Sequence, residues 1–172
     1  MTNRIFMLIG LLALAAGVHA ETYNLQLTGT ILSRTCEVES TTQTVDIGQF
    51  SANTFPVTGS VSAAKSFDIK LTGCGSAATG TLISFTGNSD SDNPVLLALS
   101  DTSTAGGMAT GIGVELLDSQ QKTLAINSAS APFYALQPGD NTLSFSLRYK
   151  STQDVVTPGN ATAVMYFDLQ YQ

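Results

Sequence analysis

The chain has 172 residues, with 7 basic and 13 acidic side chains and a formal net charge of −6. This length allows one domain with a hydrophobic core, and the acidic balance argues against nucleic acid and anionic membrane surfaces as partners. The only histidine, His19, lies in a segment that we expect to be removed. The mature chain then has no Ser-His-Asp or Cys-His nucleophilic site.

Residues 1–20 have the pattern of a secretory signal peptide. Arg4 precedes an apolar run over residues 5–16, and Val18-His19-Ala20 is a small-x-Ala cleavage pattern. The apolar run is too short for a membrane span. We therefore expect a mature, exported chain that begins at Glu21. Loss of Arg4 leaves 6 basic side chains against 13 acidic ones, a net charge of −7.

Residues 23–31 are the first predicted strand. One face carries the apolar side chains with a glycine in the same phase, and the positions between are Asn or Thr or Gln. No Gly, Pro or Asn-Gly turn separates this strand from the next candidate near Cys36, so a hairpin is poorly encoded. Two interpretations remain open: the first strand of an ordinary sandwich, or an arm that buries its apolar face outside its own domain. The residues of that face are Tyr23, Leu25, Leu27, Gly29 and Ile31.

Two cysteines remain in the exported chain, Cys36 and Cys74. An even count in an exported domain predicts one disulfide, and the alternatives are a free thiol pair or a metal site. A zinc site cannot be assembled in the usual way without a histidine or a third cysteine. On the chain-entropy model the disulfide would stabilise the fold by roughly 4 kcal/mol.

The rest of the chain predicts an antiparallel all-β sandwich in a single domain. Its apolar period is two almost everywhere, turn signals recur at strand spacing, and no window supports a helix. Loops are expected over residues 50–61 and 87–94, and turns over 138–141 and 157–160. The predicted strands cover residues 35–38, 44–48, 66–72, 81–86, 95–99, 112–118, 124–126, 143–149 and 161–172.

The last predicted strand has one apolar face, and the chain stops at Gln172, one residue after it. An immunoglobulin-like sandwich normally has a further strand beside this one. We expect its absence to leave an apolar groove and an unpaired strand edge, which a strand from another chain would cover. The residues of the apolar face are Ala163, Met165, Phe167, Leu169 and Tyr171.

Several short motifs occur together with these two ends and the cysteine pair. They are Gly29 in an alternating arm, the runs 85–87 (Phe-Thr-Gly), 97–99 (Leu-Ala-Leu), 111–118 (Gly-Ile-Gly-Val-Glu-Leu-Leu-Asp) and 158–163 (Pro-Gly-Asn-Ala-Thr-Ala), and the terminal Tyr171-Gln172. In this combination the chain resembles the chaperone–usher pilins, and within them the minor, adaptor-like subunits of type 1 fimbriae.

The resemblance implies an incomplete immunoglobulin-like sandwich that lacks its last strand and is completed by a donor strand. Residues 1–20 would be the signal peptide, 21–35 the donor arm and 36–172 the pilin domain. Tyr23, Leu25, Leu27, Gly29 and Ile31 would fill the groove of a neighbour. The strand from Ala163 to Tyr171 would edge the chain's own groove and pair with a periplasmic chaperone, which would hold the Gln172 carboxylate with basic residues.

The same resemblance implies further partners, an outer-membrane usher and neighbouring subunits, and export through the periplasm to a surface fimbrium. It implies no cofactor and no enzymatic activity. Residues 97–118 favour an adaptor subunit over a major rod subunit. A two-domain tip adhesin would need a lectin domain for which the chain has no room. A self-complemented secreted binding module, whose arm completes its own sheet, is the alternative from a different class.

Other candidate sites have weaker patterns. Asp90, Asp92 and Asn93 could suggest calcium, but the following Gly and bidentate Glu of the usual calcium loop are missing. The Gly111-x-Gly113 pair has no third glycine in register and is no phosphate cradle. A hydrolase using carboxylates alone would need a defined acidic pair, and no spacing indicates one. Arg148 and Lys150 flank a strand and are expected to face outward.

Overall fold

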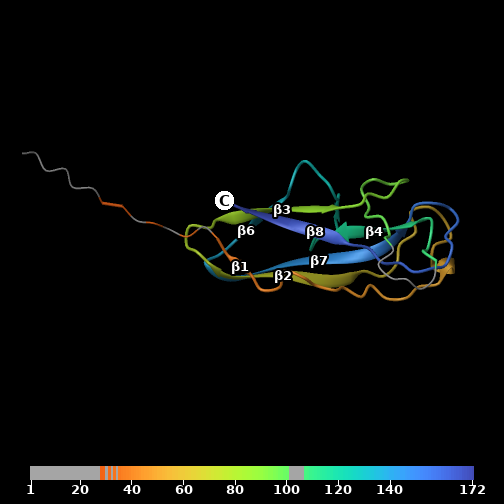
Figure 1. Cartoon of the computed structure of the whole chain (residues 1–172), viewed down its shortest axis with the longest axis horizontal. Helices are drawn as coiled ribbons and strands as arrows, with labels where there is room; N and C mark the ends of the chain where they lie inside the picture. Colours follow the sequence, from red (N-terminus) through yellow and green to blue (C-terminus); the bar gives the residue numbers. More distant parts are fainter. Residues whose placement is uncertain (1–27, 30, 32, 34, 101–106) are drawn as a thin grey trace, which may run out of the picture. The chain divides into compact units, whose positions relative to one another are not determined.

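The computed structural model describes residues 28, 29, 31, 33, 35–100 and 107–172. The chain divides into two compact units, Met1–Thr30 and Ile31–Gln172. The second unit is a β-sandwich of two antiparallel sheets (Figure 1). The predicted arm residues Tyr23, Leu25 and Leu27 lie outside the described residues. Within the described part, no helix has both the length and the apolar character needed to cross a membrane.

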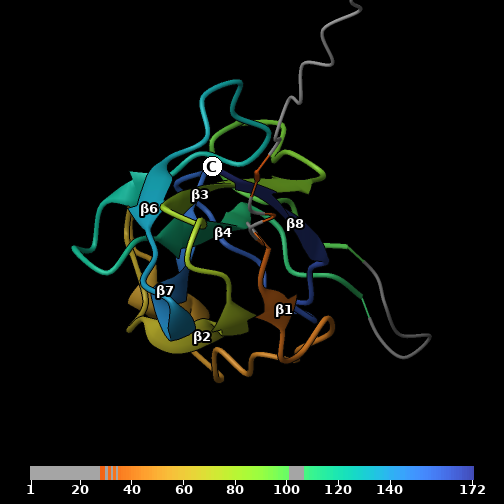
Figure 2. The same cartoon turned by 90° about the vertical axis from the view of Figure 1, so that its left-hand side faces the viewer.

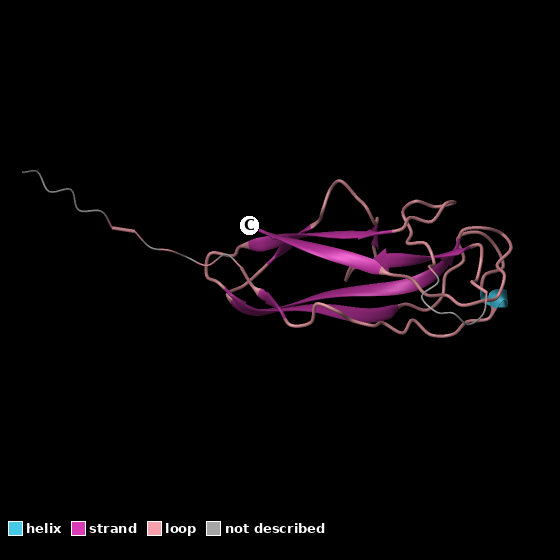
Figure 3. Ribbon diagram, viewed as in Figure 1, coloured by secondary structure: helices cyan, strands magenta, loops and turns pink. Residues whose placement is uncertain are grey.

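The larger sheet has five strands in the order β1-β2-β7-β4-β5, and the smaller has three in the order β6-β3-β8. Figure 3 shows the strands running along the sandwich with loops gathered at both ends. In the larger sheet the strands are β1 (Glu37–Val38), β2 (Lys65–Cys74), β7 (Gly139–Ser151), β4 (Ile112–Leu117) and β5 (Thr123–Leu124). In the smaller they are β6 (Phe133–Ala135), β3 (Gly80–Gly87) and β8 (Met165–Tyr171).

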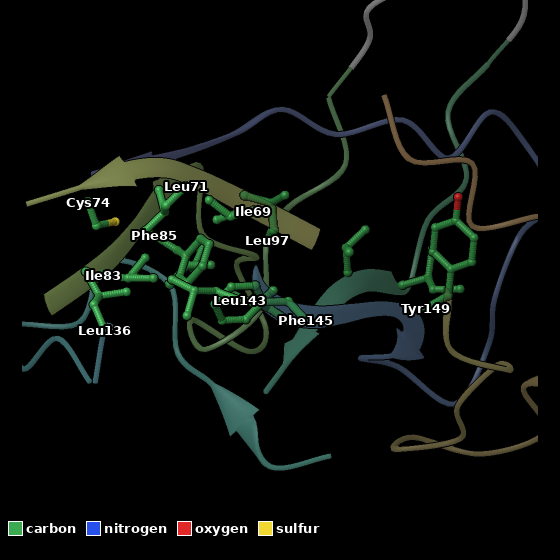
Figure 4. Packing of buried hydrophobic residues seen from close by; sticks show 14 of the residues in the cluster. Ile69, Leu71, Cys74, Ile83, Phe85, Leu97, Leu136, Leu143, Phe145 and Tyr149 are labelled. Carbon is green, nitrogen blue, oxygen red and sulfur yellow. The ribbon is translucent and has the colours of Figure 1, made fainter. Parts of the chain in front are cut away.

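Phe145 of β7 is at the centre of the core. It is 1% exposed, and its ring lies 5.7 Å from that of Phe67, 5.1 Å from Phe85 and 5.6 Å from Tyr134. These partners come from β2, β3 and β6, so one side chain joins both sheets. Figure 4 shows Phe145 beside Leu143 and Phe85 within this cluster. The period-two pattern of β7 places Leu143, Phe145 and Tyr149 on the same inward face.

The all-β sandwich predicted from the sequence is confirmed, while several local predictions were wrong. Residues 44–48 form no strand: Asp46 Oδ1 accepts a hydrogen bond from Gly48 N at 3.0 Å, and Gly48 has φ +107°, so the chain turns there.

Residues 95–99 make only isolated bridges, from Leu97 to Ser89 and Val114. The predicted loop over residues 50–61 contains a 3-10 helix, η1 (Ala52–Thr54), and strand β6 was not predicted.

The outer face of the larger sheet contains an ion cluster around Glu115 of β4, which is fully buried. Arg148 Nε and Lys150 Nζ of β7 lie 2.6 and 2.8 Å from its carboxylate, and Thr123 Oγ1 donates to it at 2.9 Å. Burial would raise the pKa of Glu115, but the hydrogen bonds from Lys150, Arg148 and Thr123 outweigh it and lower the pKa. The expectation that the two cations simply face outward is therefore incomplete: each is anchored to a buried carboxylate.

Candidate functional site

One side of the sandwich is open along a seam between β1 and β8. Strand β8 pairs along its whole length with β3, from Gly87↔Met165 to Thr81↔Tyr171, and β1 pairs with β2. Across residues 35–100 and 107–172 neither strand has a second neighbour in its sheet. Viewed from the end, β1 and β8 lie on the same side of the sandwich (Figure 2). Two unpaired strand edges therefore border this seam.

The side chains that face the seam are only half-buried. Along β8 and the residues just before it, these half-buried side chains alternate strictly with exposed ones such as Tyr166, which is 67% exposed. On the next strand of the same sheet, Ile83 and Phe85 are 0% and 4% exposed. An apolar row that packs against the core but stays partly in contact with water lacks a cover on one side. The row consists of Ala163, Met165, Phe167, Leu169 and Tyr171, and Cys36, Val38 and Ile47 are half-buried members of the same cluster.

The five apolar residues that the sequence predicts along the groove edge lie in this row, and Gln172, which was assigned to the same strand, follows it. At the end of the seam near Tyr171, a disulfide joins Cys36 to Cys74, with the two Cα atoms 4.1 Å apart. Tyr171 Oη donates a hydrogen bond to the Cys36 carbonyl oxygen at 3.3 Å, and burial raises the pKa of Tyr171. Gln172 donates its N–H to the Gly80 carbonyl, and its main-chain oxygen accepts from Thr79 N.

A cavity of about 370 Å³ borders residues 156–161, which lead into the start of β8. Its walls come from the η1 loop, from β4 and β7, and from the segment that leads into β8. The apolar side chains among them include Phe50, Phe55, Ile112, Tyr149, Val156 and Ala161. Sequence reasoning missed this cavity, although two phenylalanines in a Ser/Thr-rich loop were an available signal. The cavity is large enough for one or two apolar side chains from another segment.

The residues predicted to form a donor arm are described only in part. Ile31 is completely exposed, at 101% of its reference area. Gly29 belongs to the unit Met1–Thr30 and is not part of the sandwich unit Ile31–Gln172.

The acidic loop considered for calcium has a structural explanation. Asp90 Oδ1 accepts hydrogen bonds from the backbone N–H groups of Asp92 and Asn93, both at 3.0 Å, which closes a turn. Asp92 accepts a further bond from Gln153 Nε2 at 2.7 Å. Among the described residues no three His, Cys, Asp or Glu side chains gather as metal ligands. These carboxylates hold loops together.

Comparison with known proteins gives this geometry its context. A protein-family model described as fimbrial protein matches residues 25–172. The chain belongs to the fimbrial protein family. It is 43% identical over 155 residues to the fimbrial-like protein YcbU of Escherichia coli, covering 88% of this chain and 86% of that protein. It is 32% identical to the S-fimbrial protein subunit SfaG of Escherichia coli over 168 residues, covering 96% and 93%.

Solved structures give the same assignment for the fold of this fimbrial protein. The type I fimbria protein and antigen of Burkholderia pseudomallei is 33% identical with a TM-score of 0.63, covering 81% of this chain and 90% of that one. The P pilus rod subunit PapA is 22% identical with a TM-score of 0.65, covering 80% and 99%. The incomplete sandwich is therefore a pilin fold, and the protein is a structural subunit of fimbriae and not an enzyme.

Proposed function

We propose that the seam accepts a β-strand from another chain and that residues 21–35 of this fimbrial protein supply such a strand to a neighbour. The observation that carries the proposal is the half-buried apolar row of β8 along an edge without a partner. An added strand would pair with that edge and cover the row in one step. This is strand addition to an exposed sheet edge, a general mode of peptide recognition of which pilins are a known example.

The arm and the groove edge match in length and period. Residues 23–31 place four side chains and Gly29 on one face, residues 163–171 place five side chains on one face, and each segment spans about 30 Å as an extended strand. In an antiparallel pairing, Ile31 comes to the cavity at the start of β8 and Tyr23 to the end near Tyr171. Gly29 would then lie opposite Met165, where a side chain on the arm would compete for the same space.

The apolar contacts are sufficient for a durable complex. Burial of Tyr23, Leu25, Leu27 and Ile31 contributes on the order of 6–12 kcal/mol before the cost of ordering the arm. A backbone ladder along β8 adds direction and register. No cofactor takes part.

The proposed assembly route uses the same groove twice. A periplasmic chaperone covers the β8 edge first, with basic residues on the Gln172 carboxylate, and at the outer-membrane usher the arm of the next subunit replaces it. The product is a surface fimbrium. Residues 97–118 support an adaptor position over a rod position, although proteins similar in fold include the rod subunit PapA and the CupB6 tip adhesin of Pseudomonas aeruginosa.

A pair of arm variants tests the proposal. Gly29→Leu should block the uptake of the arm by a neighbour while leaving the subunit folded, because residue 29 is not part of the sandwich unit Ile31–Gln172. Thr28→Leu, at the adjacent outward position, is the matched control and should assemble. Assembly is measured as the mass distribution of complexes after mixing with subunits of the same fibre, and binding with a synthetic peptide of residues 21–35.

Normal assembly of Gly29→Leu would show that the arm does not enter a groove in this way. A soluble monomer that folds without a chaperone and protects residues 21–35 from proteases would instead identify a self-complemented secreted module.

A further inference from the structure

Tyr149 of β7 joins three walls of the cavity at the start of β8. Its Oη donates a hydrogen bond to the Ala161 carbonyl oxygen at 2.7 Å, and its ring meets that of Phe50 edge-on at 6.0 Å between centroids. Its backbone N–H donates to Ser62 Oγ at 3.0 Å. The residue is 8% exposed. Figure 4 shows it at one end of the core cluster with its hydroxyl pointing away from the other labelled side chains.

The hydrogen bond to Ala161 runs from the larger sheet to the segment that precedes the smaller one. Tyr149 belongs to the larger sheet, and Ala161 lies in the segment that leads into β8 of the smaller one. The neighbours of Ala161 bond instead to loop residues: Ala109 N donates to the Asn160 carbonyl at 2.9 Å, and Ser100 N to that of Thr162 at 2.8 Å. Tyr149 therefore ties this segment to a regular strand of the core.

We propose that Tyr149 is a positioning residue for strand acceptance, a role that rests on the function proposed above. Its hydroxyl fixes the Ala161 carbonyl, and with it the cavity wall at the start of β8, before an incoming arm docks. Without that bond the segment samples other positions, and only the fraction of subunits with the wall in place can receive the arm. A defect of this kind slows association and leaves dissociation unchanged, because the bound arm itself holds the segment in place.

Tyr149→Phe removes the hydroxyl and keeps the ring. The exported chain is mixed with a fluorescent peptide of residues 21–35, and association and dissociation rates are measured separately. We expect association to be about fivefold slower, the effect of losing one ordinary hydrogen bond, with dissociation within twofold of wild type. Backbone amide exchange at residues 161–164 should accelerate by a similar factor in the unbound variant, while exchange in β2 stays unchanged.

Tyr134→Phe is the matched control. Its ring packs on Phe145 of the core at 5.6 Å, but it lies on β6, at the opposite edge of the smaller sheet from β8. It should leave both rates unchanged.

Each outcome decides a separate point. An association rate for Tyr149→Phe equal to that of wild type and Tyr134→Phe would overturn the positioning role, as would a change confined to dissociation. If the wild-type chain does not bind the peptide at all, the proposed acceptance of this arm fails, and the role of Tyr149 fails with it.

Discussion

Tyr171 donates a hydrogen bond to the carbonyl oxygen of Cys36, so the last residue of β8 is joined to the residue that precedes β1 across the open seam. The Cys36–Cys74 disulfide then connects this point to the end of β2. At this end a hydrogen bond crosses the seam, and the disulfide anchors the β1 side of the seam to β2. The cavity beside Tyr149 borders the segment that leads into the start of β8.

The disulfide should be a major source of stability. Replacing both Cys36 and Cys74 by serine is expected to lower the free energy of unfolding by about 4 kcal/mol, because the unfolded chain regains the freedom of the loop that the disulfide closes. Urea unfolding monitored by far-UV circular dichroism measures the change. Reduction of the wild-type chain should give the same loss, and an undiminished unfolding midpoint in the double variant would contradict the expectation.

The Glu115 cluster predicts a loss of stability in acid. The pKa of Glu115 is lowered in the folded state, so its ionised form stabilises the fold above the pKa of the unfolded chain, and this contribution is lost as the pH falls through the lowered pKa. Glu115→Gln should lose about 2 kcal/mol at neutral pH and show a weaker pH dependence. Urea midpoints compared at neutral and strongly acidic pH test both points.

Asp154→Asn is the control for that experiment. Hydrogen bonds from Thr58 lower the pKa of Asp154 as well, but its carboxylate is exposed to solvent. It should change the neutral-pH stability little. If both substitutions lowered the stability equally, the burial of Glu115 would not be the cause of its larger expected contribution.

Among the aromatic residues, Phe145 should lose the most stability when it is replaced by alanine. Phe145→Ala removes a fully buried ring that contacts Phe67, Phe85 and Tyr134, and is expected to cost about 3–5 kcal/mol. Phe133→Ala removes a ring that is 55% exposed on β6 and should cost less than about 1.5 kcal/mol. Thermal unfolding of both variants gives the comparison, and a similar loss at the two positions would contradict this description of the core.

Features that depend on the local alternation of apolar and polar residues could be predicted from the sequence. The inward faces of β2, β3, β7 and β8 follow directly from period-two patterns. Strand β6 escaped prediction because it has only three residues and comes directly after Pro132, which ends the regular pattern. Residues 95–99 are apolar enough for a strand, but they form only single bridges, from Leu97 to Ser89 and to Val114.

Features made by distant residues could not be predicted in the same way. Glu115 and Arg148 are cross-strand neighbours only because β4 pairs with β7, a register that the sequence alone does not specify. The hydrogen bond from Tyr149 to Ala161 and the edge-on contact with Phe50 likewise require the sandwich to be assembled. The open edge was expected because its evidence, an alternating last strand, is local.

The contrast between fully buried Ile83 and the half-buried row on the adjacent strand has an energetic consequence. A solitary subunit leaves part of its folding free energy unrealised until a strand arrives from outside. Under the proposed function, each added subunit completes the folding of one before it, so that growth of the fibre proceeds spontaneously and requires no nucleotide hydrolysis.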